Sequence, residues 1–369
     1  MINRERLIAS FMEIVRIDSQ TKNERALADY LKSKLNELGL AVTEDKAGEA
    51  ASGDAGNVIG ILESRTEKTP LLFSAHMDRV APGENIKPVI EGNIIKSGGD
   101  TILGSDDGAG LAIILEMLTT LKEKGIEHGR IEVVFTVGEE GGLLGAKSLE
   151  TEKLQAKYAV ILDSTGDAGV VIVQAPAQDE IRAKLHGHAA HAGLEPEKGV
   201  NAIFAAAKAI SMMKLGRLAP ETTANIGVIK GGRATNIVPD FVEVHGETRS
   251  LNEEKLKKAT EAVTKAFTAA AAQTGARLDL TVNRLYPAFQ IPEDHELLQL
   301  IKKAGETCGI EIKLQKTGGG SDANIFNGKG IAAVNLAVGN EKVHTVNEIL
   351  RINEFTRVAE LAVKIAEFA

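Results

Sequence analysis

Cysteine is nearly absent from the sequence, and long apolar runs are missing altogether. Cys308 is the single thiol among 369 residues, so no internal disulfide forms and nothing calls for an oxidising compartment. No segment approaches the roughly 18 consecutive apolar residues that a membrane-spanning helix needs. The N-terminal segment is charged and amphipathic and lacks the apolar core of a signal peptide. We therefore expect a cytoplasmic protein without membrane contacts.

Positive charge is in the minority. The chain carries 43 lysines and arginines against 51 aspartates and glutamates, a formal net charge of −8 at pH 7. No basic stripe offsets this balance, which argues against a nucleic-acid partner. With 43% hydrophobic and 25% charged residues, the composition is that of an ordinary soluble enzyme. The length exceeds a single typical core and predicts about two domains.

The first half of the sequence alternates helix-like and strand-like segments. Short, nearly all-apolar strands joined by amphipathic helices predict an α/β layer fold with a largely buried sheet. One helix is expected to end at Gly39, because glycine commonly forms the C-cap. The expected helices cover residues 24–39 and 109–125, and the expected strands cover 57–62, 70–76, 130–137 and 157–164.

The pattern changes near Gln178. From residue 178 to 287 the expected order is strand, helix, strand, strand, helix, strand, which is the order of a ferredoxin-like module. After it, a helix, the glycine-rich segment 317–326, an apolar strand (331–338) and a final helix return to the α/β style. The simplest account is a discontinuous first domain, residues 1–177 plus 288–369, into which residues 178–287 are inserted.

Polar side chains appear where buried strands are expected to end, and α/β sheets place ligands at the carboxyl ends of their strands. His76 and Asp78 close the stretch LLFSAHMD. Residues two apart on a strand point the same way. The carboxylate could therefore fix the tautomer of the imidazole, as metal-binding histidines usually require. Taken alone, a structural histidine is the better interpretation of this pair.

Two pairs of adjacent acids stand beside glycines. Asp106 and Asp107 precede a helix, where one aspartate is commonly an N-cap that stabilises the helix by about 1 kcal/mol. An N-cap needs only one aspartate, so this interpretation leaves the second one unexplained. Glu139 and Glu140 follow an apolar strand and are bracketed by glycines, which holds them close to the strand end. One glutamate could bind a metal ion while its neighbour acts on a water molecule bound to that metal.

Two further candidates also follow strands. Asp163 closes the strand 157–164 and His344 comes after the strand 331–338, and each alone is more readily structural than catalytic. Together the strand-end residues make two histidines and three carboxylates, a set that suits two divalent ions with one bridging carboxylate. The absence of cysteine from the set argues against a structural zinc site. The candidate ligands are His76, Asp106, Glu140, Asp163 and His344.

Eight segments resemble, in order, the co-catalytic zinc exopeptidases and deacylases. That superfamily includes peptidase T, carboxypeptidase G, aminoacylases and the acetylornithine and succinyl-diaminopimelate deacylases. The resemblance covers essentially the whole chain, is greatest to peptidase T, and implies a zinc-exopeptidase-like α/β/α catalytic domain with an inserted ferredoxin-like α+β lid. The segments are SAHMDRV, GSDDGAG, GEEGGLLGAKSL, LDS, GHAAHAG, GGRATNIVPD, GETRS and VHTVNE.

The resemblance implies a role for each candidate ligand. His76 and Asp163 would hold one metal ion, Glu140 and His344 would hold the other, and Asp106 would bridge the two. The ions would most readily be zinc, with cobalt or manganese as alternatives.

Two neighbouring acids would have other roles in such enzymes. Asp78 would orient His76, and Glu139 would be the general base that takes a proton from water and hands it to the leaving amine. The peptide bond between Asp106 and Asp107 is expected to be cis.

The inserted module resembles the lid or dimerisation domain of the family, which implies a homodimer. His191 stands where the family places a histidine that reaches the active site, often that of the partner subunit. Asn236 and Arg249 stand where the main chain or carboxylate of the substrate is bound. The glycine-rich loop around Gly319 would offer backbone N–H groups to a carboxylate.

The implied activity is hydrolysis of a peptide bond in small peptides, as by an aminopeptidase or tripeptidase. An N-acyl-amino-acid deacylase, or a dipeptidase or carboxypeptidase, is the alternative on the same two-metal site. A non-catalytic metal-binding protein is a third possibility, against which the presence of Glu139 argues. Arg79 and Gly108 depart from the family, which often has threonine and lysine there, so substrate preference could differ from peptidase T.

Overall fold

The computed structural model describes residues 2–64 and 66–369. They form two compact units. The first holds the described residues up to Val173 together with Gln290–Lys316 and Ser321–Ala369, and the second holds Gln174–Phe289 with Thr317–Gly320. The second unit is therefore an insertion into the first. Within the described residues, no helix is both long and apolar enough to cross a membrane.

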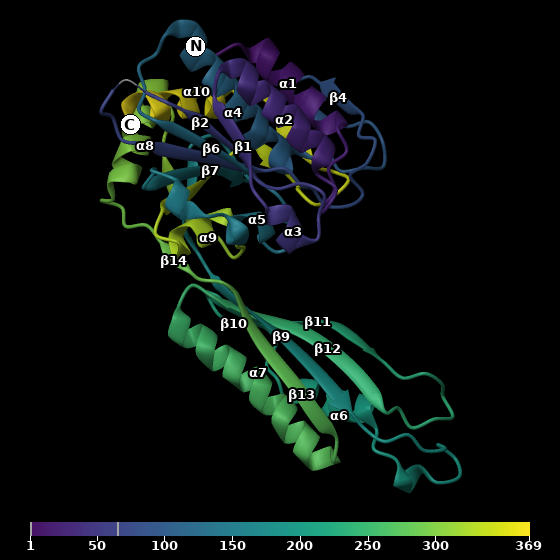
Figure 1. The fold of residues 1–369 in the computed structure, drawn as a ribbon. Helices are drawn as coiled ribbons and strands as arrows, with labels where there is room; N and C mark the ends of the chain where they lie inside the picture. Colours follow the sequence, from purple (N-terminus) through teal and green to yellow (C-terminus); the bar gives the residue numbers. More distant parts are fainter. Residues whose placement is uncertain (1, 65) are drawn as a thin grey trace. The chain divides into compact units, whose positions relative to one another are not determined.

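A nine-stranded sheet lies at the centre of the first unit (Figure 1). Its strands are β1 Ala41–Glu44, β2 Val58–Leu62, β3 Leu71–His76, β6 Ile131–Thr136, β7 Tyr158–Ser164, β8 Val170–Ala175, β14 Phe289–Gln290, β15 Lys313–Lys316 and β16 Ala332–Ala337. The order is β1-β2-β6-β3-β7-β16-β8-β14, and β15 also pairs with β8. The central strands β6, β3, β7 and β16 are parallel, and every residue of β3 and β6 is buried. Parallel strands covered on both faces need such continuous apolar runs.

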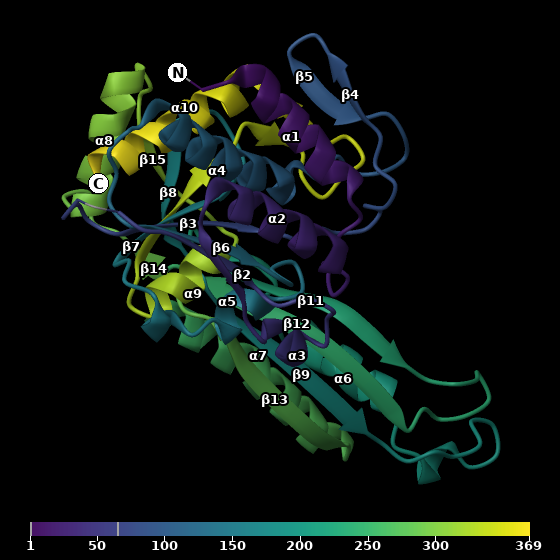
Figure 2. The same ribbon diagram turned by 45° about the horizontal axis from the view of Figure 1, so that its top comes forward.

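Helices cover both faces of this sheet, which confirms the predicted α/β/α arrangement. The helices are α1 Arg4–Arg16, α2 Arg25–Leu38, α3 Ala47–Ala51, α4 Ser105–Lys124, α5 Leu144–Ser148, α8 Glu296–Cys308, α9 Asp322–Gly328 and α10 Ile352–Phe368. On one face α4 packs on β3 and β7 and is itself covered by α1 and α10; α3, α5 and α9 lie on the other face (Figure 2).

A second, smaller sheet in the first unit was not expected from the sequence. It contains β4 Pro88–Glu91, β5 Ile94–Ser97, β17 Asn340–Glu341 and β18 Ile349–Arg351 in the antiparallel order β17-β18-β5-β4. These strands have two to four residues each, too few to show a hydrophobic period. Their importance is positional, because the connection between β17 and β18 carries His344.

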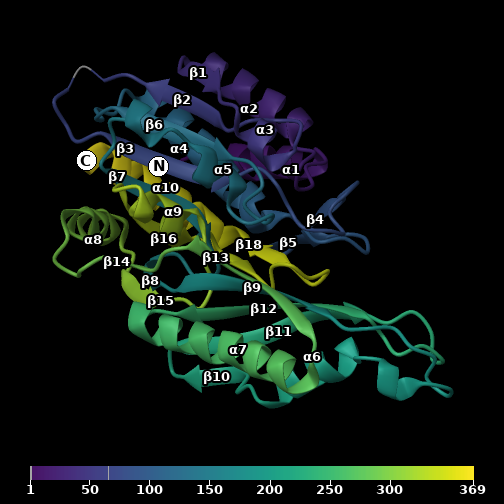
Figure 3. The same cartoon turned by 60° about the horizontal axis from the view of Figure 1, so that its bottom comes forward.

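The second unit has the predicted ferredoxin-like order with one additional strand. Its elements are β9 Ala177–His186, α6 Ala202–Ser211, β10 Gly216–Ala219, β11 Thr222–Gly231, β12 Phe241–Ser250, α7 Glu253–Thr274 and β13 Arg277–Tyr286. The sheet order is β10-β11-β12-β9-β13, and β10 is the strand not expected. Both helices pack on one face of the sheet (Figure 3). Alanines of α6 and α7 and Phe267 fill the core between them.

The local signals at helix ends behave as expected. Gly39 follows α2 with φ 92° and its N–H bonds to the carbonyls of Asn36 and Leu35, the C-cap that was predicted. At the start of α4, Asp106 and Asp107 have non-helical backbone angles. The regular turns therefore begin near the predicted residue 109.

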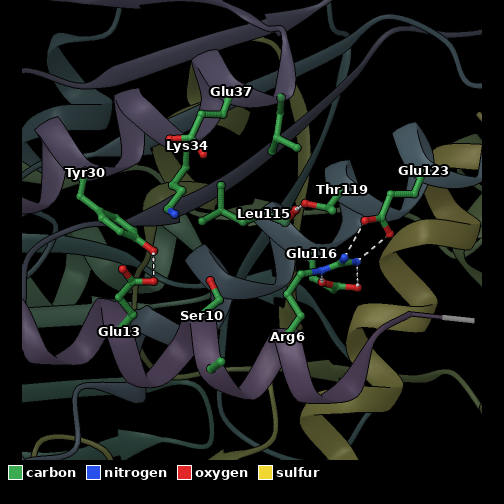
Figure 4. Close-up of a pocket in the computed structure, with 12 residues that line it drawn as sticks. Arg6, Ser10, Glu13, Tyr30, Lys34, Glu37, Leu115, Glu116, Thr119 and Glu123 are labelled. Atoms are coloured by element: carbon green, nitrogen blue, oxygen red, sulfur yellow. Dashed lines mark hydrogen bonds and ion pairs between the residues drawn. The ribbon is translucent and has the colours of Figure 1, made fainter.

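An ion pair between Arg6 and the buried Glu116 joins α1 to α4 (Figure 4). The guanidinium of Arg6 donates to both oxygens of Glu116, with its Nε 2.6 Å from Oε2 and its Nη2 2.9 Å from Oε1. The side chain of Glu116 is 1% exposed and that of Arg6 is 33% exposed. Glu116 also accepts hydrogen bonds from the backbone N–H of Asn3 and the hydroxyl of Thr120. A buried carboxylate with these partners depends on its cation.

Replacing Arg6 by methionine should therefore destabilise the first unit. We expect a loss of about 1–3 kcal/mol, because Glu116 stays buried while the remaining donors replace only part of the lost interaction. Urea unfolding followed by circular dichroism measures the change. Arg4→Met on the same helix is the matched control: Arg4 makes an exposed bond to Asn353, and its loss should cost less than about 0.5 kcal/mol. Equal effects of the two substitutions would contradict the assignment.

Candidate metal centre

The carboxyl ends of the parallel strands bring the predicted ligands to one edge of the first unit's sheet. His76 is the last residue of β3, Asp163 lies near the end of β7, and Glu140 follows β6. His344 comes after β16, on the connection between β17 and β18, and has φ 62°. A left-handed backbone conformation is uncommon for a residue other than glycine, and such conformations are found more often at functional sites. Asp106 enters the group from the first turn of α4.

Asp106 lies between the two imidazoles. Its Oδ1 is 2.9 Å from Nε2 of His76, and its Oδ2 is 3.1 Å from Nε2 of His344. Each histidine has a second carboxylate neighbour: Asp163 Oδ1 is 3.7 Å from His76 Nε2, and Glu140 Oε1 is 2.7 Å from His344 Nε2. The five side chains thus form two groups of one imidazole and two carboxylate oxygens, joined through Asp106.

The donor set and its burial fit two divalent cations. All donors are imidazole nitrogen or carboxylate oxygen, as zinc and similar ions prefer. The ligand atoms of His76, Asp106 and Glu140 lie within 4.8 Å of one another. The imidazole of His76 is 2% exposed and the carboxylates of Asp106, Glu140 and Asp163 are 11–14% exposed. His344 is 50% exposed, so solvent reaches the site on its side. Positive charge among the buried carboxylates would offset their repulsion.

The electrostatics of the site reflect this crowding. Burial raises the pKa of Asp163 to about 7, and the nearby charge of Asp106 adds to the effect. Burial also raises the pKa of Glu139 well above its usual value, with Asp163 adding to the rise. Burial alone would lower the pKa of His76, but hydrogen bonding to Asp106, Asp163 and Asp78 holds it well above its usual value. Hydrogen bonding to Asp106 and Glu140 raises the pKa of His344 to about 10.

Asp78 acts on the site through two different groups. Nδ1 of His76 lies 2.8 Å from the backbone carbonyl of Asp78 and 3.4 Å from its carboxylate, so the main chain is the nearer partner. The carboxylate accepts the backbone N–H groups of Glu139 at 2.8 Å and Glu140 at 3.2 Å. It also accepts the hydroxyl of Thr21. Asp78 therefore joins the end of β3 to the turn that carries both glutamates.

The adjacent aspartates 106 and 107 divide two functions between them. Asp107 accepts the N–H of Gly110 at 3.0 Å, which caps α4, and the N–H of His76 at 3.1 Å. Asp106 points to the imidazoles instead. The peptide bond between the two aspartates is cis, as the family resemblance implied. The capping interpretation holds for Asp107, and the position of Asp106 is compatible with the ligand interpretation.

Several residues near the site were not singled out from the sequence. Buried Glu24 accepts the N–H of Gly138, at the turn before the two glutamates. Buried Asp322 accepts the hydroxyl of Thr136 at the end of β6. Glu348 lies four residues after His344, and this place inside the segment VHTVNE is the sequence signal that could have identified it.

The two departures from the family pattern both face α1. The guanidinium of Arg79 is buried and donates to the carbonyls of Val15 at 2.9 Å and Ile14 at 3.3 Å, at the C-terminal end of that helix. A Cβ on Gly108 would lie 3.1 Å from Val15 and 3.5 Å from Ile14. Cations favour helix C-termini. Arg79 therefore caps α1, and its side chain is directed at that helix.

The four predicted substrate-binding residues lie in the second unit and form two pairs. His191 and Asn236 are exposed, and the N–H next to His191, that of Ala192, bonds to the carbonyl of Asn236. The guanidinium of Arg249 is 3.5 Å from the carbonyl of Gly318, beside Gly319.

These two pairs belong to opposite ends of the second unit's sheet. Arg249 is opposite Gln178 where β9 begins, and Phe241 is opposite His186 where β9 ends. His191 follows His186 in sequence. Ten residues of strand extend over about 30 Å. One chain therefore does not bring His191 and Arg249 to the same small ligand.

Comparisons with known proteins agree with this arrangement. Residues 179–275 match the peptidase dimerisation domain, and residues 57–204 match peptidase family M28. The crystal structure of the aminopeptidase PepT from Bacillus cereus is 46% identical, with a TM-score of 0.90 over 99% of this chain and 98% of that one. A tripeptidase structure from Staphylococcus aureus is 42% identical, with a TM-score of 0.94 over 100% of this chain and 98% of that one. Carboxypeptidase G2 of Pseudomonas is 30% identical over 86% of this chain and 77% of its own length.

These relatives cover nearly the whole chain at an identity that is sufficient to assign a family. The resemblance found in the sequence is confirmed, and the implied class of enzyme with it. The chain belongs to the metallopeptidase family of the aminopeptidase PepT and carboxypeptidase G2.

Proposed function

We propose that this metallopeptidase removes the N-terminal residue from small peptides, with tripeptides as the preferred substrates. The observation that carries the proposal is the sharing of Asp106 between two imidazoles, each with a further carboxylate, beside a glutamate outside both groups. The choice of substrate is supported by the names of the two similar structures, an aminopeptidase and a tripeptidase.

The five strand-end side chains would hold two divalent ions, for which we propose zinc. His76 and Asp163 would hold one, Glu140 and His344 the other, and Asp106 would bind both. Ions held there would polarise the scissile carbonyl and lower the pKa of a water molecule. Glu140, Asp106 and Asp163 contact the Nε2 atoms of His76 and His344. Asp78 faces the other ring nitrogen of His76, and Glu139 is left as the proposed proton-transfer group.

Glu139 would be the general base and then the general acid. Its backbone N–H is fixed by Asp78 at 2.8 Å, so the start of its side chain has a defined position. It would take one proton from the attacking water as the new C–O bond forms. It would then give that proton to the amine nitrogen as the C–N bond breaks. The peptide yields a free amine and a carboxylic acid, which releases the second proton of the water to solvent as it ionises.

The adjacent glutamates allow a matched test. Glu139→Gln preserves size and the backbone bond to Asp78, and it should lower kcat by at least about 10²-fold because the proton acceptor is gone. It should still bind two equivalents of zinc. Glu140→Gln should instead lose zinc, which metal analysis after dialysis measures. Normal turnover by the Glu139 variant would show that another group is the base.

A deacylase, dipeptidase or carboxypeptidase activity is the second candidate. Carboxypeptidase G2, a relative at 30% identity, is named for action at the other peptide terminus. The side chain of Arg249 is 27% exposed, and its guanidinium is hydrogen-bonded to Glu247, so its charge already has a carboxylate partner within the chain. This favours the aminopeptidase reading over the carboxypeptidase reading.

A substrate panel with metal reconstitution decides between these activities. The protein stripped with a chelator should be inactive on tripeptides, and zinc, cobalt or manganese should restore hydrolysis. Tripeptides with a free N-terminus should react at least about tenfold faster, by kcat/KM, than dipeptides or N-acetyl amino acids, a difference of about 1.4 kcal/mol. Hydrolysis of acylated substrates alone would overturn the aminopeptidase proposal, and full activity after stripping would overturn the metal assignment.

We also propose that the second unit joins two copies of the chain. β10 covers only Thr222–Ala224 of β11, and in the described residues the rest of that edge is unpaired. Ile229 on this edge is 51% exposed, and Phe204 on α6 is 60% exposed. An exposed apolar strand edge is a template for pairing with another chain. A dimer would also explain why His191 and Arg249 lie at opposite ends of one sheet.

A charge placed on the free edge should separate the copies. Ile229→Lys should weaken dimerisation at least about tenfold, since a lysine on an edge strand opposes pairing. Sedimentation velocity across a concentration series measures the change. Val282→Lys is the control, because Val282 is 42% exposed on β13 at the other edge of the same sheet. A wild-type protein that is monomeric at assay concentrations would contradict the proposal.

A further inference from the structure

The turn that delivers Asp106 is held by one buried carboxylate. Glu348 is 1% exposed. Its Oε2 accepts the backbone N–H groups of Leu103 at 2.8 Å and Gly104 at 2.9 Å. Its Oε1 accepts the N–H of Ser105 at 2.8 Å, the hydroxyl of Ser105 at 2.6 Å and the N–H of Asp106 at 3.1 Å. Five donors therefore converge on two oxygens from four consecutive residues.

The two oxygens of Glu348 act as acceptors in this arrangement. Each oxygen of Glu348 faces at least two N–H or O–H donors, so a group with a donor of its own at either position would place two donors face to face. Successive backbone N–H groups that point at one anion fix the path of the chain. The N–H of Asp106 itself is one of the five, and so the position of the Asp106 backbone depends directly on Glu348.

Glu348 also belongs to the segment that carries His344. Its backbone N–H bonds to the carbonyl of Thr345 at 3.1 Å, in the connection between β17 and β18. The carboxylate thus links the turn of one proposed ligand to the loop of another. Oδ2 of Asp106 and Nε2 of His344 are 3.1 Å apart. The hydrogen bonds between the turn at 103–106 and Glu348 would therefore set the distance between Asp106 and His344.

A buried cation supports the same turn. Arg79 lies close enough for the charge of Glu348 to stabilise its guanidinium. A Cβ on Gly104 would come within 3.3 Å of Nε of Arg79, so the turn packs directly on this side chain. Gly104 has φ 73° and allows that close approach. The turn is therefore in contact with one buried anion and one buried cation.

We propose that Glu348 is the positioning residue of the metal centre: it holds Asp106 in register with His344 so that one carboxylate can serve both ions. The inference rests on the two-metal site proposed above and is independent of the substrate. Loss of partners that orient metal ligands typically lowers metal affinity or activity by about 10- to 100-fold. The same loss is expected here, without loss of the fold.

The test compares Glu348→Gln with Glu354→Gln by titrating the stripped proteins with zinc against a competing chelator. Glu354 is the matched control, because it accepts a backbone N–H, that of Ala168, at 2.8 Å from a different loop. Glu348→Gln should bind zinc about 10- to 100-fold more weakly. At saturating zinc its kcat should also fall, with KM changed less than about threefold, since the substrate contacts remain. Glu354→Gln should behave as wild type in both measurements.

The possible outcomes separate the two proposals. If the wild-type protein binds no pair of zinc ions, the metal site itself is refuted. If the wild type binds two and Glu348→Gln binds them equally well, only the role of Glu348 is refuted. Should Glu348→Gln fail to fold by circular dichroism, Ser105→Ala carries the test, since it removes one of the five donors. A zinc affinity weakened about three- to tenfold would support the proposal, and an unchanged affinity would overturn it.

Discussion

The carboxylate of Asp106 has one oxygen for each of two imidazoles, and this sharing constrains where the other groups of the site can lie. His76 and His344 come from segments far apart in the sequence. They meet because β3 and β16 run parallel in one sheet, so their carboxyl ends share an edge. A carboxylate between two rings leaves little freedom, since a shift of the turn toward one histidine weakens its contact with the other.

Burial makes this shared carboxylate both effective and difficult to maintain. Several acids lie within a few ångströms of one another with little water. Burial raises the pKa values of Asp163 and Glu139, and repulsion from neighbouring carboxylates adds to the rise. The protein meets this difficulty with hydrogen bonds from its backbone. Asp78 and Asp107 each accept two N–H groups, and Glu348 accepts four. Fixed dipoles therefore hold these three carboxylates in place.

The sequence was sufficient for the elements that follow a long pattern. Buried strands such as β3 and β6 have continuous apolar runs, and the polar residues after them mark the site. Glycine marked the end of α2. Contacts between residues far apart in the sequence could not be predicted from it. The sequence around Arg79 does not show that its guanidinium donates to a carbonyl at the end of α1. The sequence around Glu348 likewise does not show that its carboxylate accepts N–H groups from the turn at 103–106. Short strands such as β4 and β17 have too few residues to show a hydrophobic alternation.

The order of the supporting residues along the chain has a consequence for synthesis. His76, Asp106, Glu140 and Asp163 leave the ribosome early, whereas His344 and Glu348 emerge near the end. A growing chain that has not reached residue 344 has only one of the two imidazoles and lacks the carboxylate that accepts the N–H of Asp106. On the proposed ligand set, the two metal groups are complete only in the nearly finished polypeptide. A fragment that ends before residue 344 would lack the second group and so could not hydrolyse peptides by the proposed mechanism.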